Sequence, residues 1–203
     1  MYRFSGRLNR AWLGILFFLL CPASAQAHSD LRMGAFAGGL LHPLEVPSHL
    51  LILLGLGLRL GQHPPFHLRK FFSIFAPVAA AALLTTVMED NISVPQPFLM
   101  LIALCIGALI SSGLATPPWV NNSFLVIAAL AIGLDSGVSG VSAIVVAKVL
   151  FATWVCLLVI IGYIAFYVSF LPPRKWLQIG VRILGSWIVA ISFLVLAFYL
   201  KKH

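Results

Sequence analysis

Long apolar runs separated by short proline-rich connectors dominate the chain. Six runs are predicted to be membrane-spanning helices, at about Met33–Leu58, Phe71–Met88, Phe98–Leu114, Phe124–Leu134, Val141–Phe166 and Ile179–Leu200. A helix needs about 20 residues to cross the hydrocarbon core of a bilayer. The fourth run is short, with Trp119 as an alternative start, and the fifth has Leu171 as an alternative end. The pattern predicts an all-α membrane protein, a bundle of about six transmembrane helices.

Composition supports lipid as the solvent of this chain. Of its 203 residues, 61% are hydrophobic and only 9% are charged, whereas a soluble domain carries roughly a quarter charged residues. The length fits one domain with no room for a separate soluble one. The sequence contains no nucleotide-binding glycine loop, no G-x-S-x-G and no H-E-x-x-H. We therefore expect neither a soluble enzyme nor an energy-coupling ATPase.

The first 27 residues resemble a cleavable signal peptide. Three arginines precede the short apolar run Ala11 to Leu20, and Ala25-Gln26-Ala27 follows as an A-x-A cleavage site. Cleavage would leave His28 as the mature N-terminus, outside the inner (plasma) membrane. The domains expected are thus a signal peptide, 1–27, and a six-span transmembrane domain, 28–203. The formal net charge of +8 falls when this segment leaves.

Charged connectors agree with that orientation. Glu89 and Asp90 lie in the second connector, on the predicted outer side. All five acidic residues fall outside or in the outer half of the membrane, which would attract cations, although five can also gather there by chance. Lys201 and Lys202 would end outside, against the positive-inside rule. The charges indicate membrane topology and no nucleic-acid partner. Basic residues flank the first and fifth connectors, predicted to be cytoplasmic: Arg59, Arg69, Lys70, Arg174, Lys175 and Arg182.

The first predicted span contains ionisable residues, which are costly in a bilayer and usually face the interior of a bundle. In a continuous helix, His42, Glu45 and His49 share one stripe, because they lie three and four positions apart. Two imidazoles and a carboxylate suit a borderline divalent metal such as nickel, cobalt or zinc. The alternative is a structural polar cluster of hydrogen-bonded packing residues.

Two prolines in the same run would bend the helix. Pro43 and Pro47 cannot donate to the carbonyls of Gly39 and Pro43. Those oxygens would be free to accept a proton or to face an ion, as in the broken helices of transporters. The prolines would also allow His42 to join Glu45 and His49 at one point.

Three further features bear on the site. His28, as a new N-terminus, would offer an amine and an imidazole to a metal, or is incidental. Asp135 is a second-site ligand or a helix cap for the span near Val141. Lys148 would pair with Glu45 or Asp135, or extend toward the membrane surface.

Pairs of glycines four apart, Gly34 with Gly38 and Gly133 with Gly137, would allow close helix packing.

The sequence resembles the HupE/UreJ family of membrane proteins in three features. These are the signal ending in Ala27-His28, the glycines from Gly34 to Gly39 and the motif from His42-Pro43-Leu44 to His49. The family's first motif has a histidine, five residues, then Asp-His. His42 and His49 match both histidines, and Ser48 stands in place of the Asp. In the segment 132–140, which corresponds to a second, histidine-rich motif, Asp135 is the only strong ligand.

The resemblance implies a small six-span nickel or cobalt permease that supplies metalloenzymes. We therefore expect a secondary permease of the inner membrane that is not an enzyme, with His42, Glu45, His49, Asp135 and His28 as metal ligands. No tightly bound cofactor is expected, since the nickel or cobalt ion is the cargo. The expected partners are the metal ion, the lipid bilayer, metalloenzyme-maturation proteins or further copies of the chain.

Two alternatives stay open. The chain could be a non-transporting HupE/UreJ-like accessory protein whose metal site has decayed, as the missing second motif suggests. A membrane enzyme or proton relay using Glu45, His49 and Lys148 is the third hypothesis, for which the sequence offers no substrate pocket.

Overall fold

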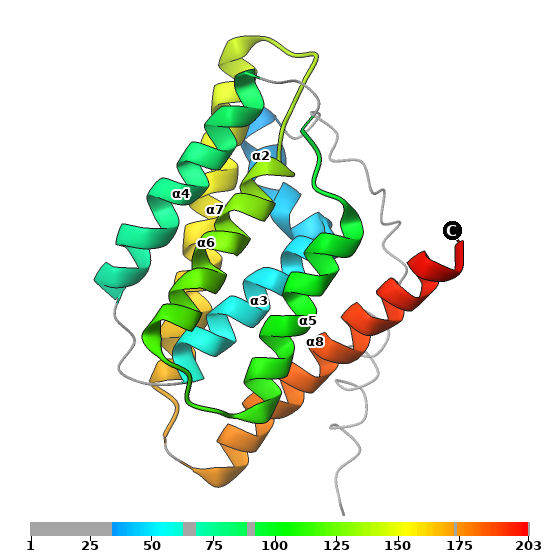
Figure 1. Cartoon of the computed structure of the whole chain (residues 1–203). Coiled ribbons are helices and arrows are strands. Elements are labelled where there is room, and N and C mark those ends of the chain that lie inside the picture. The colour runs from blue at the N-terminus through cyan, green and yellow to red at the C-terminus, as the bar shows by residue number, and fades with distance from the viewer. Residues whose placement is uncertain (1–33, 63–67, 89–91, 173, 203) are drawn as a thin grey trace, which may run out of the picture.

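The computed structural model describes residues 34–62, 68–88, 92–172 and 174–202, and within these ranges it is all-helical (Figure 1). The predicted signal peptide and His28 lie outside the described residues. The helices are α2 (Ala35–Glu45), α3 (Pro47–Gln62), α4 (Leu68–Met88), α5 (Gln96–Ser112), α6 (Pro118–Leu134), α7 (Ala143–Ser169) and α8 (Lys175–Lys202).

Three of the described helices, α4, α7 and α8, are long and apolar enough to cross a membrane. The pair α2 and α3 passes the same test together, although the two are bent by 76° at their junction. Helices α5 and α6 are apolar but have only 17 residues each. The all-helical membrane bundle is therefore confirmed in the described residues, with three or four spans by length, and the count of six stays a prediction.

The break in the first predicted span lies at Val46. Pro47 begins α3, where its missing N–H is harmless. The residue before a proline is pushed out of the helical region, and Val46 is extended, with φ −88° and ψ 110°. Met33–Leu58 is thus not one bent helix, as the sequence suggested, but two helices meeting at a sharp angle.

The other proline of this segment, Pro43, lies inside α2 and is buried. It leaves the carbonyl of Gly39 without its usual helical donor. The hydroxyl of Thr153 on α7 donates to that oxygen at 2.9 Å. The carbonyl that we expected to be bare is therefore occupied, because a buried backbone oxygen needs a partner, and it fixes α2 to α7.

Helix α3 lies in the core of the bundle, where Ile52, Leu53 and Leu56 are buried (Figure 1). Both α2 and α3 pack mainly on α7, α4 packs on α6, and α5 packs on α8. Side chains facing away from these contacts are apolar and exposed along α8, for example Trp187 and Phe193. Such a surface fits contact with lipid in a membrane bundle.

Small residues set the distances between these helices. A Cβ added at Gly57 would meet the Ile164 side chain of α7, and one at Gly133 would meet Ala82 of α4. Gly133 therefore mediates close packing, as predicted. Gly34 and Gly38 do not, because a Cβ at either position would meet nothing within 4 Å.

The α2–α7 contact predicts opposite outcomes for two neighbouring glycines. In Gly39→Ala the new Cβ would overlap the backbone carbonyl of Val149, and such overpacking destabilises by about 1–3 kcal/mol. We expect a lower Tm in detergent. Gly38→Ala is the control, since its methyl enters open space and alanine favours helix, so its Tm should be unchanged or higher. Equal Tm values for the two variants would contradict this packing.

Candidate functional site

A hydrogen bond joins α3 to the end of α6. His49, in the first turn of α3, lies with Nε2 3.0 Å from Oδ2 of Asp135. His49 is fully buried, and the Asp135 side chain is 18% exposed. The other carboxylate oxygen, Oδ1, accepts from the backbone N–H of Val94 at 3.0 Å. One carboxylate therefore holds α3, the end of α6 and the connector before α5 together.

Asp135 does not cap the following helix, which was one of its two predicted roles. The N-cap of α7 is Ser142, and that residue makes no capping bond with its side chain. Asp135 instead ends α6, where its backbone N–H bonds to Ala131. Its side chain is thereby directed to His49, which no spacing along the sequence could show.

The bond to Asp135 determines which nitrogen of a neutral His49 ring carries the proton. In a neutral His49, Nε2 carries the proton that it donates to the carboxylate, so Nδ1 keeps its lone pair. Nδ1 is buried and has no hydrogen-bond partner among the described residues. Metal-binding histidines commonly donate their second nitrogen to a carboxylate in this way. The His49 ring is thus oriented as in a metal-binding histidine, with Nδ1 as the nitrogen that would face the metal.

His42 places a second imidazole beside the first. Its ring, in the last turn of α2, is 5.9 Å from the His49 ring between centroids, at an interplanar angle of 78°. Its Nε2 is also buried without a partner in the described part of the chain, as is the hydroxyl of Ser48. Buried polar atoms are normally satisfied, so these three atoms at the α2–α3 break are candidates to bind a polar guest.

Glu45 lies apart from this group. It is the last residue of α2, its side chain is exposed, and the break at Val46 removes the continuous helical stripe on which its predicted position depended. Within the described residues, no three His, Cys, Asp or Glu side chains gather closely enough to hold a metal ion. Glu45 and His28 as ligands stay predictions.

Other ionisable side chains differ from the sequence picture. Lys148 is exposed on α7, which fits the alternative in which it extends toward the membrane surface. Arg59, expected to mark a cytoplasmic connector, is only 3% exposed and donates to several groups of α5 and α6. The burial of Arg59 was not predicted from the sequence. The signal available was its place between apolar residues, four positions before the connector begins.

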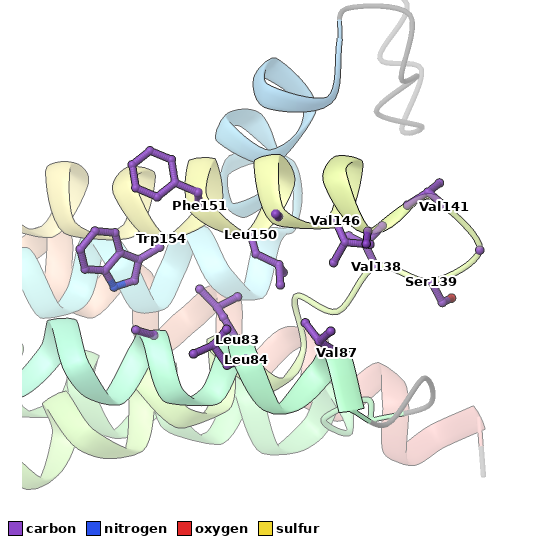
Figure 2. A pocket seen from close by; sticks show the side chains of 14 residues that line it. Leu83, Leu84, Val87, Val138, Ser139, Val141, Val146, Leu150, Phe151 and Trp154 are labelled. Atoms are coloured by element: carbon purple, nitrogen blue, oxygen red, sulfur yellow. The ribbon is translucent and has the colours of Figure 1, made fainter.

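A large apolar cavity lies elsewhere among the described residues. It measures about 640 Å³ and lies between α4, α7 and the connector 138–141, with Leu83 and Leu84 facing Leu150 across it (Figure 2). Its walls are nearly all apolar, and the Trp154 indole N–H in it already donates to the carbonyl of Ala76 at 2.9 Å. His42, His49 and Asp135 do not line it. This groove suits lipid chains and offers nothing to a cation.

The apolar helices and the buried polar cluster define a multi-pass membrane protein. A family model described as HupE / UreJ protein matches residues 16–195, most of the chain. The chain belongs to the HupE/UreJ family, which confirms the resemblance found from its residues. The family is associated with nickel or cobalt transport or with urease and hydrogenase maturation. No curated protein sequence and no solved structure matches the chain.

The double hydrogen bonding of Asp135 predicts its effect on stability. Asp135→Ala removes the partner of both His49 and Val94, and hydrogen bonds to charged groups each contribute about 1.5–3 kcal/mol. Asp135→Asn keeps one acceptor oxygen, so it should cost less. We expect the order of Tm in detergent to be wild type, Asp135→Asn, then Asp135→Ala. Adding His49→Ala to Asp135→Ala should cost less than the sum of the single changes, and strict additivity would contradict the bond.

Proposed function

We propose that this protein is a secondary permease for nickel or cobalt in the inner membrane, with His42 and His49 as the residues that take the ion. The observation that carries the proposal is a pair of buried imidazole nitrogens at a broken helix, neither of which has a hydrogen-bond partner among the described residues. Membership in the HupE/UreJ family supports the same cargo. The orientation proposed, with the mature N-terminus outside, rests on the signal peptide and the charged connectors.

The donor set favours a borderline transition metal. Imidazole nitrogen suits nickel, cobalt and zinc, whereas calcium and magnesium prefer oxygen. Asp135 would act through His49 by holding the ring and its proton, and would not itself need to touch the ion. Two protein ligands leave the remaining positions to water and backbone oxygen. A weakly held ion is what transport requires, because the site must also release it.

Glu45 would serve the approach of the ion. Its exposed carboxylate lies one residue before the break. An exposed negative charge raises the local concentration of cations, and salt screens this effect. In this proposal the ion is drawn to the outer face near Glu45, reaches His42 at the end of α2, and passes to His49 at the start of α3.

A glutamine at position 49 separates binding from structure. The His49→Gln side chain can still donate an N–H to Asp135, but its other polar atom is an amide oxygen, a poorer ligand for nickel and cobalt than an imidazole nitrogen. We expect uptake of nickel and cobalt into cells to fall about tenfold or more in His49→Gln and in His42→Ala, while the Tm of His49→Gln stays close to that of the wild type. Uptake should be measured against the amount of protein in the membrane.

Glu45→Gln is the matched control among the polar residues of this segment. It should leave maximal uptake unchanged and raise the metal concentration needed for half-maximal uptake at low ionic strength. Wild-type uptake by His49→Gln would remove the proposed site. Equal losses in Glu45→Gln and His49→Gln would favour the continuous stripe over the broken helix.

A non-transporting accessory protein is the second candidate, favoured by the lack of any three-ligand cluster in the described residues. It would predict that the wild-type chain confers no metal uptake and binds no nickel or cobalt after purification. It would instead predict co-purification with proteins of metalloenzyme maturation. Metal-dependent uptake that requires His49 excludes this alternative.

A further inference from the structure

Helix α3 also carries a buried charged residue near its other end. Arg59 follows His49 by ten positions, so the two backbones lie about 15 Å apart along the helix. The arginine is 3% exposed. A charged side chain inside a membrane bundle is expensive and usually has a function there. The family resemblance assigns no role to this residue.

The guanidinium group of Arg59 connects α3 to three other parts of the bundle. It donates from Nε to Oδ1 of Asn121 at 3.2 Å, from Nη1 to Oε1 of Gln62 at 3.1 Å and to the Leu109 carbonyl at 3.5 Å, and from Nη2 to the Leu114 carbonyl at 2.9 Å and to Oγ1 of Thr116 at 2.6 Å. These acceptors belong to α3, the end of α5, the connector after it and the first turn of α6.

Helices α3 and α6 are therefore tied by polar side chains near both ends. His49 bonds to Asp135 at one end, and Arg59 bonds to Asn121 at the other. Between these ties, every buried residue of α3 and of α6 is apolar or glycine. An ion at His49 thus faces a packed apolar core toward the predicted cytoplasmic side, and the buried guanidinium of Arg59 lies at the end of that core.

A buried guanidinium opposes the passage of a divalent cation. Arginine stays protonated in proteins, and like charges repel far more strongly in a protein interior than in water. Positive side chains at constrictions are a known means of excluding cations from pores. The charge of Arg59 therefore acts in the direction opposite to the ligands at His42 and His49.

We propose that Arg59 and its acceptors on α5 and α6 form the inner gate of the permease, closing the cytoplasmic side of α3 and α6 by packing and by positive charge. This rests on the proposed transport function. In this structure the gate is closed, and passage of the ion requires the guanidinium to leave Asn121 and Thr116.

The test uses the full-length protein in vesicles that contain a fluorescent dye quenched by nickel or cobalt. Arg59→Gln removes the charge, and Arg59→Lys keeps the charge but loses the forked hydrogen bonding. We expect Arg59→Gln to speed metal entry about tenfold over wild type, and Arg59→Lys to change it less than about threefold. Arg182→Gln is the matched control, because the exposed Arg182 donates to Ser111 at the same end of α5 and should have no effect.

Glycerol entry into the same vesicles separates a charge barrier from general damage. Arg59→Gln should not speed glycerol entry, whereas a disordered bundle would leak both solutes. Equal metal entry in Arg59→Gln and wild type, or equal acceleration by Arg59→Gln and Arg59→Lys, would overturn the gate.

The permease proposal and the gate proposal fail in different ways. If wild-type entry depends on His49 but not on Arg59, the permease stands and the gate is wrong. If wild-type vesicles admit no metal while Arg59→Gln admits it and His49→Gln/Arg59→Gln admits it equally, the barrier stands and the His49 site is wrong.

Discussion

The bond between His49 and Asp135 is the constraint around which the polar interior is arranged. It joins residues 86 positions apart and holds the end of α6 against the start of α3. Without the carboxylate, the buried ring would have no defined orientation and its two nitrogens would be equivalent candidates for the proton. With it, one nitrogen is committed to structure and the other is left with a lone pair inside the bundle.

Much of the fold follows from the distribution of apolar residues, because each predicted run overlaps a helix of the structure and the first run overlaps two. Proline also marked the correct place for the break near Val46. The angle at the break could not be predicted, since it depends on α7, which accepts the end of α2 through Thr153 and the contact between Gly39 and Val149. Local sequence determined that the helix stops, and tertiary packing determined the direction of the next one.

The candidate site was only partly visible in the sequence. His42 and His49 were found because histidines in an apolar run are rare and costly. The role given to Glu45 assumed a continuous helix, so it depended on a local geometry that the break removes. Asp135 was predicted as a second-site ligand or a helix cap, but its bond to His49 was not predicted, and Arg59 was predicted only as a topological charge. Their contacts cross between helices, and helix spacing along one run carries no information about such contacts.

The helices of the bundle differ in length, and some are shorter than the hydrocarbon core of a bilayer is thick. With 17 residues each, α5 and α6 extend about 25 Å, less than the roughly 30 Å of a typical hydrocarbon core, while α7 and α8 exceed it. A bilayer adjusts to such mismatch by thinning beside the short helices, and long helices adjust by tilting. The thickness of the surrounding bilayer therefore influences how α5 and α6 are positioned relative to the longer helices.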